Sequence, residues 1–378
     1  MKILFLNTHE DFGGAEEYIN QTAEELESRG HEIEKISLIG KKSDINFSQK
    51  FPRRYLQRFF ASIKVRKMRQ KIKAFDPDVI HVHNIHYGEI PILRLLKNTS
   101  TPVVKTFHDY TFFCECEWGV HGKKLCEGKP EKCLRDGEIS PIHYLFRKPL
   151  HRLRTYMLTK SFEKALAPSK DLTKLANKWV GTKTLHNFVD LEKYGKNSEI
   201  KKKGLLYFGR IADEKGIDDL LHAYSKIENP PQLKIAGKGD ETKYRQMAED
   251  LGIKEKVKFK GFIKEEEIPK LFQGAKAVVM PSKWRENSPL TLLEVMASGT
   301  PVIAPEIGGF PDYIENEKNS YLFDFRDIES LETTLKQVIS EESSELDSIS
   351  TKARDTAEKY GLNDHTSKLE EIYESVKG

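Results

Sequence analysis

Short apolar runs alternate with amphipathic stretches along most of the chain. In its second half these runs are Gly204–Phe208, Gln232–Ala236, Val257–Lys260, Ala277–Met280 and Thr300–Ala304. Each run is followed by a loop and, in most cases, by residues with the spacing of a helix. Buried strands of a parallel sheet have this length and polarity, and amphipathic helices connect them. The pattern predicts a doubly wound α/β domain.

The first half has the same alternation and predicts a second domain of the same class. Its expected strands are Lys2–Leu6, His31–Leu38, Asp78–His83, Pro102–Phe107 and Ala165–Ser169, with a helix from Ala15 to about Arg29. The polar run 192–203 is the expected linker. We therefore expect an N-terminal domain of residues 1–190 and a C-terminal domain of residues 191–360. Residues 361–378 are expected to form a helix that packs back towards the N-terminal domain.

The stretch 280–314 contains the most informative loop of the second half. Ser288 is a suitable N-cap and Pro289 suits the first helical position, so a helix is expected to begin at Pro289. Its open N-terminus, from Ser288 through Pro289 and Leu290 to Thr291, is a plausible seat for a phosphate. Glu286 precedes this helix and Glu294 lies inside it. Taken alone, each glutamate is more simply read as a solvated surface residue.

Other polar residues follow the predicted strands, at the edge where open α/β sheets place their ligands. Arg210 and Lys215 follow the strand at 204–208 and can converge on one diphosphate, although two solvated cations would give the same pattern. Gly13 and Gly14 follow the first strand, either as a helix-entry turn or as a phosphate contact. His108 ends another strand, where an imidazole beside Asp109 can share or donate a proton near neutral pH.

Three further histidines, His81, His83 and His86, cluster around a strand end. Strand alternation places His81 and His83 on the same side of the sheet. This placement favours histidines that are satisfied in the core or that face an acceptor over a metal triad.

Composition and charge limit the class of protein. The 378 residues suffice for two domains, and 32% are charged, which indicates a soluble globular protein. The net charge of +4 does not indicate nucleic acid, and we expect no such partner. No apolar run is long enough to span a membrane, and the first residues are too short an apolar run for a secretory signal. A cytoplasmic location is expected, either free or peripheral at the inner face of the membrane.

Four cysteines fall within the loop 114–133, at Cys114, Cys116, Cys126 and Cys133. Such clustering in a cytosolic chain favours metal binding over a disulfide framework. The C-x-C spacing is tighter than the usual C-x2-C of zinc sites. The sequence therefore leaves three interpretations of these cysteines: a structural zinc site, free thiols or an adventitious disulfide.

The region 50–73 is rich in lysine and arginine, contains no acidic residue, and carries interleaved aromatic and aliphatic side chains. A basic helix with an apolar side suits the surface of an anionic membrane. An amphipathic helix that covers a sheet would have the same pattern. Both interpretations remain open at the level of sequence.

Several of these motifs occur together in one family. They are Tyr207–Arg210 with Lys215-Gly216, Ala236-Gly237-Lys238-Gly239, Gly261-Phe262, Pro281-Ser282, Glu286 with Glu294, the run 297–304, and 308–312, with Gly13–Glu16, His108-Asp109 and 186–190 in the first half. As a set they resemble the family 4 retaining glycosyltransferases, also called group 1 glycosyltransferases. The resemblance covers nearly the whole chain.

This resemblance implies the GT-B fold, with two Rossmann-like domains facing across a cleft. It also implies that Arg210 and Lys215 bind the diphosphate of a UDP- or GDP-linked sugar and compensate the charge of the leaving nucleotide. Glu294 would hold the ribose and Glu286 would contact the sugar near the reacting carbon. His108 would assist at the donor sugar or acceptor. The backbone of Gly13, Gly14, Gly237 and residues 288–291 would approach the phosphates.

The expected function is that of a hexosyltransferase that acts with retention on a hydroxyl acceptor. The acceptor is expected to be a glycan or lipid-linked glycan of cell-surface polysaccharide synthesis, and no catalytic metal is expected. Two alternatives are a sugar-nucleotide epimerase of similar fold and a two-domain ligand-binding protein without chemistry. The missing G-x-G-x-x-G motif disfavours a nicotinamide-dependent oxidoreductase.

Overall fold

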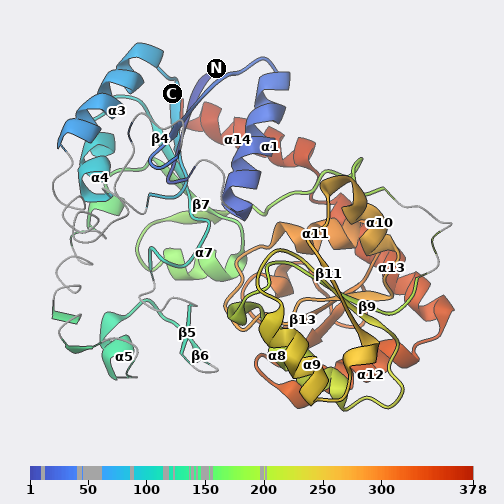
Figure 1. Ribbon diagram of the computed structural model, residues 1–378. Coiled ribbons are helices and arrows are strands. Elements are labelled where there is room, and N and C mark those ends of the chain that lie inside the picture. Colours follow the sequence, from blue (N-terminus) through green and yellow to red (C-terminus); the bar gives the residue numbers. More distant parts are fainter. Residues whose placement is uncertain are drawn as a thin grey trace. The chain divides into compact units, whose positions relative to one another are not determined.

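The computed structural model divides the chain into two compact units (Figure 1). Unit 1 comprises Met1–Glu117, Cys126–Asn187 and Leu362–Gly378, and unit 2 comprises Trp118–Leu125 and Phe188–Gly361. The structure describes the chain except residues 10–12, 41–44, 46–61, 86–88, 114–118, 122–123, 136, 138–139, 142–143, 146–152, 154–155, 196–199, 201 and 378. The last helix of the chain thus belongs to the same unit as the first strand.

Unit 1 contains a parallel sheet of six strands in the order β2-β1-β3-β4-β7-β8. The strands are β1 (Lys2–Asn7), β2 (Glu32–Ser37), β3 (Val79–Val82), β4 (Val103–Thr106), β7 (Lys164–Ala167) and β8 (Thr182–Thr184). The helices are α1 (Gly14–Ser28), α3 (Ser62–Phe75), α4 (Glu89–Lys97), α5 (Pro130–Arg135), α7 (Lys170–Ala176) and α14 (Leu362–Lys377).

Alternating side chains of β1 bury both faces of this sheet. Leu4 and Leu6 point into a core that also contains Met68 of α3. Phe5, between them, packs edge-on against the ring of His81 in β3. That second face is covered by α1 and α14, which lie beside one another in Figure 1. The sheet is therefore covered on both faces, as a doubly wound unit requires.

Unit 2 contains a parallel sheet of six strands in the order β11-β10-β9-β12-β13-β14. The strands are β9 (Leu205–Phe208), β10 (Leu233–Ala236), β11 (Val257–Gly261), β12 (Ala277–Val279), β13 (Val302–Pro305) and β14 (Tyr321–Phe323). The helices are α8 (Ile217–Ser225), α9 (Thr242–Asp250), α10 (Ile268–Gln273), α11 (Leu290–Ala297), α12 (Ile328–Ser340) and α13 (Ser343–Glu358). A short antiparallel pair, β5 (Val120–His121) and β6 (Lys124–Leu125), is grouped with this unit.

Two separate cores form on the two faces of the second sheet. Leu205 and Tyr207 of β9 join the core beneath α8, α9 and α12. Leu206, between them, joins the core beneath α10 and α11. The predicted class, two doubly wound α/β domains, is confirmed.

The strand order shows where each unit can bind a ligand. In unit 2 the order reverses between β9 and β12, and in unit 1 it reverses between β1 and β3. At such a switch point the loops that follow adjacent strands diverge and leave a crevice at the carboxyl edge. No helix among the described residues combines the length and the apolar character needed to cross a membrane.

Candidate functional site

Glycines hold the loops at the carboxyl edge of unit 2 in direct backbone contact. A Cβ atom added at Gly237, where φ is 150°, would lie 1.7 Å from the carbonyl oxygen of Gly209. Two backbone hydrogen bonds join the loop after β9 to the end of β10 and its loop. Gly209 N donates to Ala236 O at 3.1 Å, and Ile211 N donates to Lys238 O at 2.9 Å. Gly237 therefore lets the backbone of these two loops approach closely beside the switch point.

Lys215 and Glu286 meet at this switch point, although 71 positions separate them in the chain. Lys215 ends the short 3-10 helix Asp213–Lys215 after β9, and Glu286 lies in the loop after β12. Lys215 Nζ lies 2.6 Å from Glu286 Oε1, and the hydroxyl of Ser282 donates to the same oxygen at 2.8 Å. The ammonium also lies 4.8 Å from the ring centroid of Trp284. Two of the predicted site residues thus form an ion pair, in which the carboxylate of Glu286 is buried and the ammonium of Lys215 is partly exposed.

The ion pair keeps Glu286 charged although only 5% of this residue is exposed. Burial alone would raise the pKa of its carboxyl group. The charge of Lys215 and the hydrogen bonds from Lys215 and Ser282 outweigh burial, so the pKa lies below its ordinary value. Glu286 is therefore a carboxylate at neutral pH, and it stands beside a cation.

The loop that carries Glu286 is fixed to its surroundings at several points. A Cβ at Gly308 would lie 2.0 Å from Glu286 O, and Gly309 N donates to that oxygen at 2.9 Å. Lys283 Nζ bonds Asp218 Oδ2 of α8 at 2.5 Å, and Lys283 O accepts from the guanidinium of Arg326 at 3.0 Å. The sequence motifs contained the glycines, but they did not identify Lys283 or Arg326 as supports of this loop.

Arg210 and Glu294 take other positions in unit 2. Arg210 pairs with Glu214 at 2.8 Å, and its side chain is more than half exposed. Glu294 lies half-buried within α11. The structure therefore brings Lys215 and Glu286 into contact, while the side chain of Arg210 reaches into solvent.

The start of α11 differs from the sequence prediction. The helix begins at Leu290, with Pro289 at the N-cap, and no side chain among the described residues caps it. The hydroxyl of Ser288 instead lies 2.6 Å from the hydroxyl of Tyr313. The prediction that Ser288 is the N-cap was wrong, because this tertiary contact takes its side chain. The first turn, with Leu290 and Thr291, still has no capping side chain and can face an anion.

In unit 1, Gly13 and Gly14 form the entrance to α1. Gly13 has a φ of 102° and is the N-cap, and Gly14 is the first residue of the helix. In the first turn, Glu16 is buried and accepts a hydrogen bond from Asn7 Nδ2 at 2.9 Å. Asn7 ends β1, so this contact ties the helix to the strand that precedes it.

His108 follows β4 and contacts a second histidine. Its Nε2 lies 2.8 Å from Nδ1 of His83, which follows the neighbouring strand β3. The rings of His81 and His83 lie on the same side, as alternation predicted, with centroids 4.1 Å apart. Asp109, which was expected beside His108, accepts a hydrogen bond from Thr111 N at 2.9 Å. His86 lies outside the described residues.

Helix α14 supplies two more members of this cluster. His365 Nε2 lies 2.9 Å from the hydroxyl of Tyr18, and His365 Nδ1 lies 2.8 Å from His186 O. The hydroxyl of Tyr373 lies 2.6 Å from His81 Nδ1. No residue pattern in α14 indicated chemistry, and only the long-range fold brings its side chains to these histidines.

The histidines of this cluster are neutral. Burial, with the charge of Lys105 next in importance, lowers the pKa of His108 to about 3. Burial likewise lowers the pKa of His365 to about 4 and that of His83 well below its ordinary value. At neutral pH, His108 is therefore an uncharged imidazole.

The cysteine loop is described only in part. Cys114 and Cys116 lie outside the described residues. Cys126 and Cys133 are buried in the core of unit 1, and Cys126 takes part in a disulfide bond. Zinc binds thiolates rather than disulfide sulfurs. The zinc site remains a prediction, and the described residues include no group of ligands that could hold a metal.

The described part of the basic region is α3, since residues 46–61 lie outside the description. Its apolar side belongs to the core, because Met68 and Ile72 are buried and Val65 and Phe75 pack against the same cluster. Its other side exposes Arg66, Lys67, Arg69 and Lys73. For this part of the region, the interpretation as a helix that covers the sheet is correct, and a basic surface remains.

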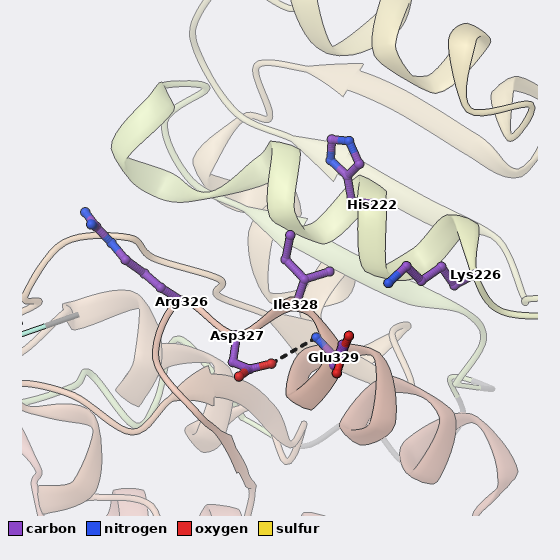
Figure 2. A pocket seen from close by; sticks show the side chains of 6 residues that line it. All are labelled: His222, Lys226, Arg326, Asp327, Ile328 and Glu329. Atoms are coloured by element: carbon purple, nitrogen blue, oxygen red, sulfur yellow. Dashed lines mark hydrogen bonds between the residues drawn. The ribbon is translucent and has the colours of Figure 1, made fainter. Parts of the chain in front are cut away.

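A shallow hollow of about 530 Å³ lies elsewhere on unit 2, between α8 and the start of α12 (Figure 2). It is lined by His222, Lys226, Arg326, Asp327, Ile328 and Glu329. Its polar groups have structural roles: Lys226 pairs with Glu332 at 3.5 Å, and Asp327 caps α12. The hollow contains none of the predicted donor-site residues.

Comparison with known proteins covers both units. Residues 190–367 match the family described as "Glycosyl transferases group 1", and residues 12–193 match "Glycosyltransferase Family 4". A sulfoquinovosyl transferase of Arabidopsis thaliana is 27% identical over 85% of this chain and 61% of its own length. A D-inositol 3-phosphate glycosyltransferase of Corynebacterium urealyticum is 30% identical over 47% of this chain and 44% of its own length. The matches thus span about half of the length of these relatives.

Solved structures match nearly the whole length of the chain. The sucrose-phosphate synthase of Thermosynechococcus elongatus matches 99% of this chain and 98% of its own, with a TM-score of 0.78 and 17% identity. An Anabaena protein solved in complex with UDP matches 99% of this chain and 100% of its own, with a TM-score of 0.74 and 19% identity. At such identities the likeness concerns the fold, which is GT-B.

Proposed function

The chain belongs to the group 1 glycosyltransferases, and we propose that it transfers a hexose from a nucleotide-diphosphate-sugar to a hydroxyl acceptor with retention of anomeric configuration. The observation that carries this proposal is the buried pair of Lys215 and Glu286 at the switch point of unit 2. A cation and a carboxylate held at that edge suit a ligand with an anionic part and a hydroxylated part. A nucleotide-sugar has both.

The chemistry assigns a role to the cations. Cleavage of the bond between the sugar and the phosphate leaves negative charge on the diphosphate and positive charge on the sugar ring. Lys215, Arg210 and the uncapped first turn of α11 can stabilise the leaving diphosphate electrostatically. These groups would supply the positive charge that a divalent ion can supply beside a phosphate, so we propose that the reaction needs no metal.

The carboxylates would act on the sugars. Glu286 is ionised beside Lys215, and it would accept hydrogen bonds from the donor sugar close to the reacting carbon. Glu294, one element further on, would hold the hydroxyls of the ribose. In unit 1, His108 would donate a hydrogen bond to the sugar or the acceptor. The backbone of Gly13 and Gly14 would approach the phosphates.

We further propose a UDP- or GDP-linked donor and a glycan or lipid-linked glycan acceptor, as in the synthesis of cell-surface polysaccharides. Relatives of the same fold were solved with UDP and with UDP-glucose, which supports the diphosphate part of the donor. The acceptor is inferred from the family resemblance and the basic surface of α3. A structural zinc site of the four cysteines on the loop 114–133 remains a separate proposal, and it requires the reduced thiol of Cys126.

A panel of nucleotide-sugars tests the proposal. Purified protein is incubated with UDP- and GDP-linked hexoses, and nucleotide release and thermal shift are measured for each. We expect one donor both to stabilise the protein and to release its nucleotide slowly. Stabilisation without any release, with or without glycan acceptors, would favour a ligand-binding protein. Conversion of one nucleotide-sugar into another would favour an epimerase.

A lipid-linked acceptor implies that the protein meets a membrane surface, and α3 is the proposed contact. Its exposed Arg66, Lys67 and Arg69 would each contribute roughly 1 kcal/mol near anionic lipid. We expect binding to phosphatidylserine vesicles at low salt, weakened at least about tenfold by reversing these three charges. Reversal of Lys256, Lys258 and Lys260 in unit 2 is the matched control. Equal weakening by both triple variants would contradict the role of α3.

A further inference from the structure

The side chain of His83 lies in unit 1 at the point where β3 ends. It is completely buried, and the edge of its ring meets the rings of Phe5 and Tyr18 with centroids 5.1 and 5.8 Å away. Its backbone is satisfied, because its N–H donates to Leu6 O at 2.8 Å and its carbonyl accepts from Lys105 Nζ. Burial of an imidazole in such surroundings is costly unless its nitrogens find partners.

Only one of its two ring nitrogens has a partner among the described residues. Nδ1 of His83 lies 2.8 Å from Nε2 of His108. Nε2 of His83 is buried and has no hydrogen-bond partner within the part of the chain that the structure describes. The nearby His81 is different, since its two nitrogens contact Tyr373 at 2.6 Å and Thr106 at 2.8 Å. Of the residues that the structure describes, only His108 therefore forms a hydrogen bond with the ring of His83.

The unpartnered nitrogen decides where the protons lie. Both rings are neutral, so the short contact between His83 and His108 contains one proton. If Nε2 of His83 carried a proton, a buried N–H would lack an acceptor, which is strongly unfavourable. A buried acceptor without a donor is tolerated more readily. His83 thus carries its proton on Nδ1 and donates it to Nε2 of His108.

This arrangement fixes the second histidine as well. A neutral imidazole whose Nε2 accepts a hydrogen bond carries its own proton on Nδ1. Neither ring takes up a second proton at neutral pH, because burial and the charge of Lys105 lower the pKa of both. His108 is then a hydrogen-bond donor through Nδ1 and not a general base.

We propose that His83 is a positioning residue that fixes the Nδ1–H tautomer of His108, so that His108 donates a hydrogen bond to an oxygen of the bound substrate. The proposal rests on the proposed function, in which His108 acts at the sugar or the acceptor. The sequence suggested that His108 shares or donates a proton beside Asp109. In the present proposal, His108 is instead a neutral hydrogen-bond donor whose tautomer is fixed by His83. Because the N–H of His108 is a hydrogen-bond donor, the substrate atom that it contacts is an acceptor, such as an oxygen of a sugar hydroxyl or of a phosphate.

The tautomer is measured directly by nitrogen NMR. Protein labelled with ring-15N histidine is compared with His83→Phe, which keeps an aromatic ring of similar size, and with His83→Asn, which keeps a polar group near Nδ1. We expect His108 in the unchanged protein to show a protonated Nδ1 and an unprotonated Nε2. His83→Phe should yield a mixture of both tautomers, and His83→Asn should restore the original one.

Kinetics and a matched control complete the test. When the tautomers mix, only the fraction with the original tautomer is competent, so kcat/KM in His83→Phe should fall in proportion to that fraction, about twofold for an even mixture, and recover in His83→Asn. Tyr373→Phe removes a hydrogen bond from His81 in the same cluster without touching His108. It should lower thermal stability but leave the His108 nitrogen shifts unchanged.

Three results would overturn the proposal. They are a protonated Nε2 on His108 in the unchanged protein, an unaltered tautomer in His83→Phe, and an altered tautomer with unaltered kcat/KM. Failure of the proposed function is recognisable separately, because then no nucleotide-sugar is turned over by any variant while the nitrogen spectra can still show the tautomer.

Discussion

Replacement of Lys215 by methionine would separate the structural from the catalytic role of the ion pair at the switch point. Methionine keeps most of the apolar stem of Lys215 and removes its charge. The carboxylate of Glu286, only 5% exposed, then keeps the hydrogen bond from Ser282 but loses its cation. A buried charge without a counter-charge is one of the few single changes that cost several kcal/mol.

The magnitude follows from the burial of the two partners. Removing one partner of a buried pair costs about 3–5 kcal/mol, and this range applies to Lys215→Met. Glu286→Gln leaves the ammonium of Lys215, whose side chain is 19% exposed and has partial access to water, so we expect roughly 1.5–3 kcal/mol. The double variant has neither charge of this ion pair and should be within about 1–2 kcal/mol of the original protein.

The stability lost in Lys215→Met should depend on pH in a definite direction. With Lys215 present, the pKa of Glu286 lies below its unfolded value, so the ionised carboxylate stabilises the fold above that unfolded value, near 4.5. Without Lys215, burial dominates and raises the pKa, so the carboxylate destabilises the fold at neutral pH. Protonation at lower pH removes this penalty. The stability deficit of Lys215→Met should therefore be largest near neutral pH and shrink as the pH falls.

Urea denaturation followed by circular dichroism measures the free energy of unfolding of the four proteins between neutral and mildly acidic pH. Turnover should be lost in all three variants, including the stable double variant, because each lacks a charge that the reaction uses. A cost below about 1 kcal/mol for Lys215→Met, or a deficit independent of pH, would refute the reasoning. A double variant no more stable than Lys215→Met would do so as well.

Three further predictions concern other parts of the molecule. Gly237→Ala should destabilise unit 2 by about 3 kcal/mol or more in thermal denaturation, because its Cβ would lie 1.7 Å from Gly209 O. Gly181 has open space around it, so Gly181→Ala should change stability by less than about 0.5 kcal/mol. Equal effects of the two substitutions would contradict the packing argument. Deletion of residues 362–378 should unfold unit 1, as judged by limited proteolysis, because it removes the partners of Tyr18 and His81 and uncovers one face of the sheet; a protease-resistant unit 1 would show that α14 is dispensable. A chelator should leave turnover unchanged, and loss that is restored by Mg²⁺ or Mn²⁺ would count against compensation of the diphosphate by Lys215 and Arg210.

The sequence predicted the fold well because the relevant signals are local. Apolar runs at 2–6, 204–208 and 277–280 correspond to β1, β9 and β12 to within one residue at each end. Strand alternation also predicted correctly that His81 and His83 lie on one side of the sheet. Periodicity of this kind reports which faces are buried, and burial is what selects the element.

Features that depend on distant residues were missed or wrong. The prediction of Ser288 as an N-cap used only its neighbours, whereas its hydroxyl contacts Tyr313, 25 positions later. The sequence did not reveal that α14 contributes to the histidine cluster, because His365 contacts Tyr18 from 347 positions away. The apolar residues of α3 are compatible in sequence with both a protein core and a membrane surface. Their burial in the core, as for Met68 and Ile72, is a property of the fold. No local pattern contains this information.

The site was predictable as a set of residue types and not as a geometry. Spacing placed Lys215 and Glu286 at the ends of two strands, and the strand order then brought those ends together. Their direct pairing, and the pairing of His83 with His108, depend on side-chain directions that spacing does not specify. These contacts supply the physical basis for the proposed roles.

The anomeric configuration of the product is a direct test of transfer with retention. Proton NMR of the reaction with the donor identified by the nucleotide-sugar panel would record the anomeric signal of the first product before it equilibrates. We predict a product with the same configuration as the donor sugar. A product with the opposite configuration would contradict retention at the site formed by Lys215 and Glu286.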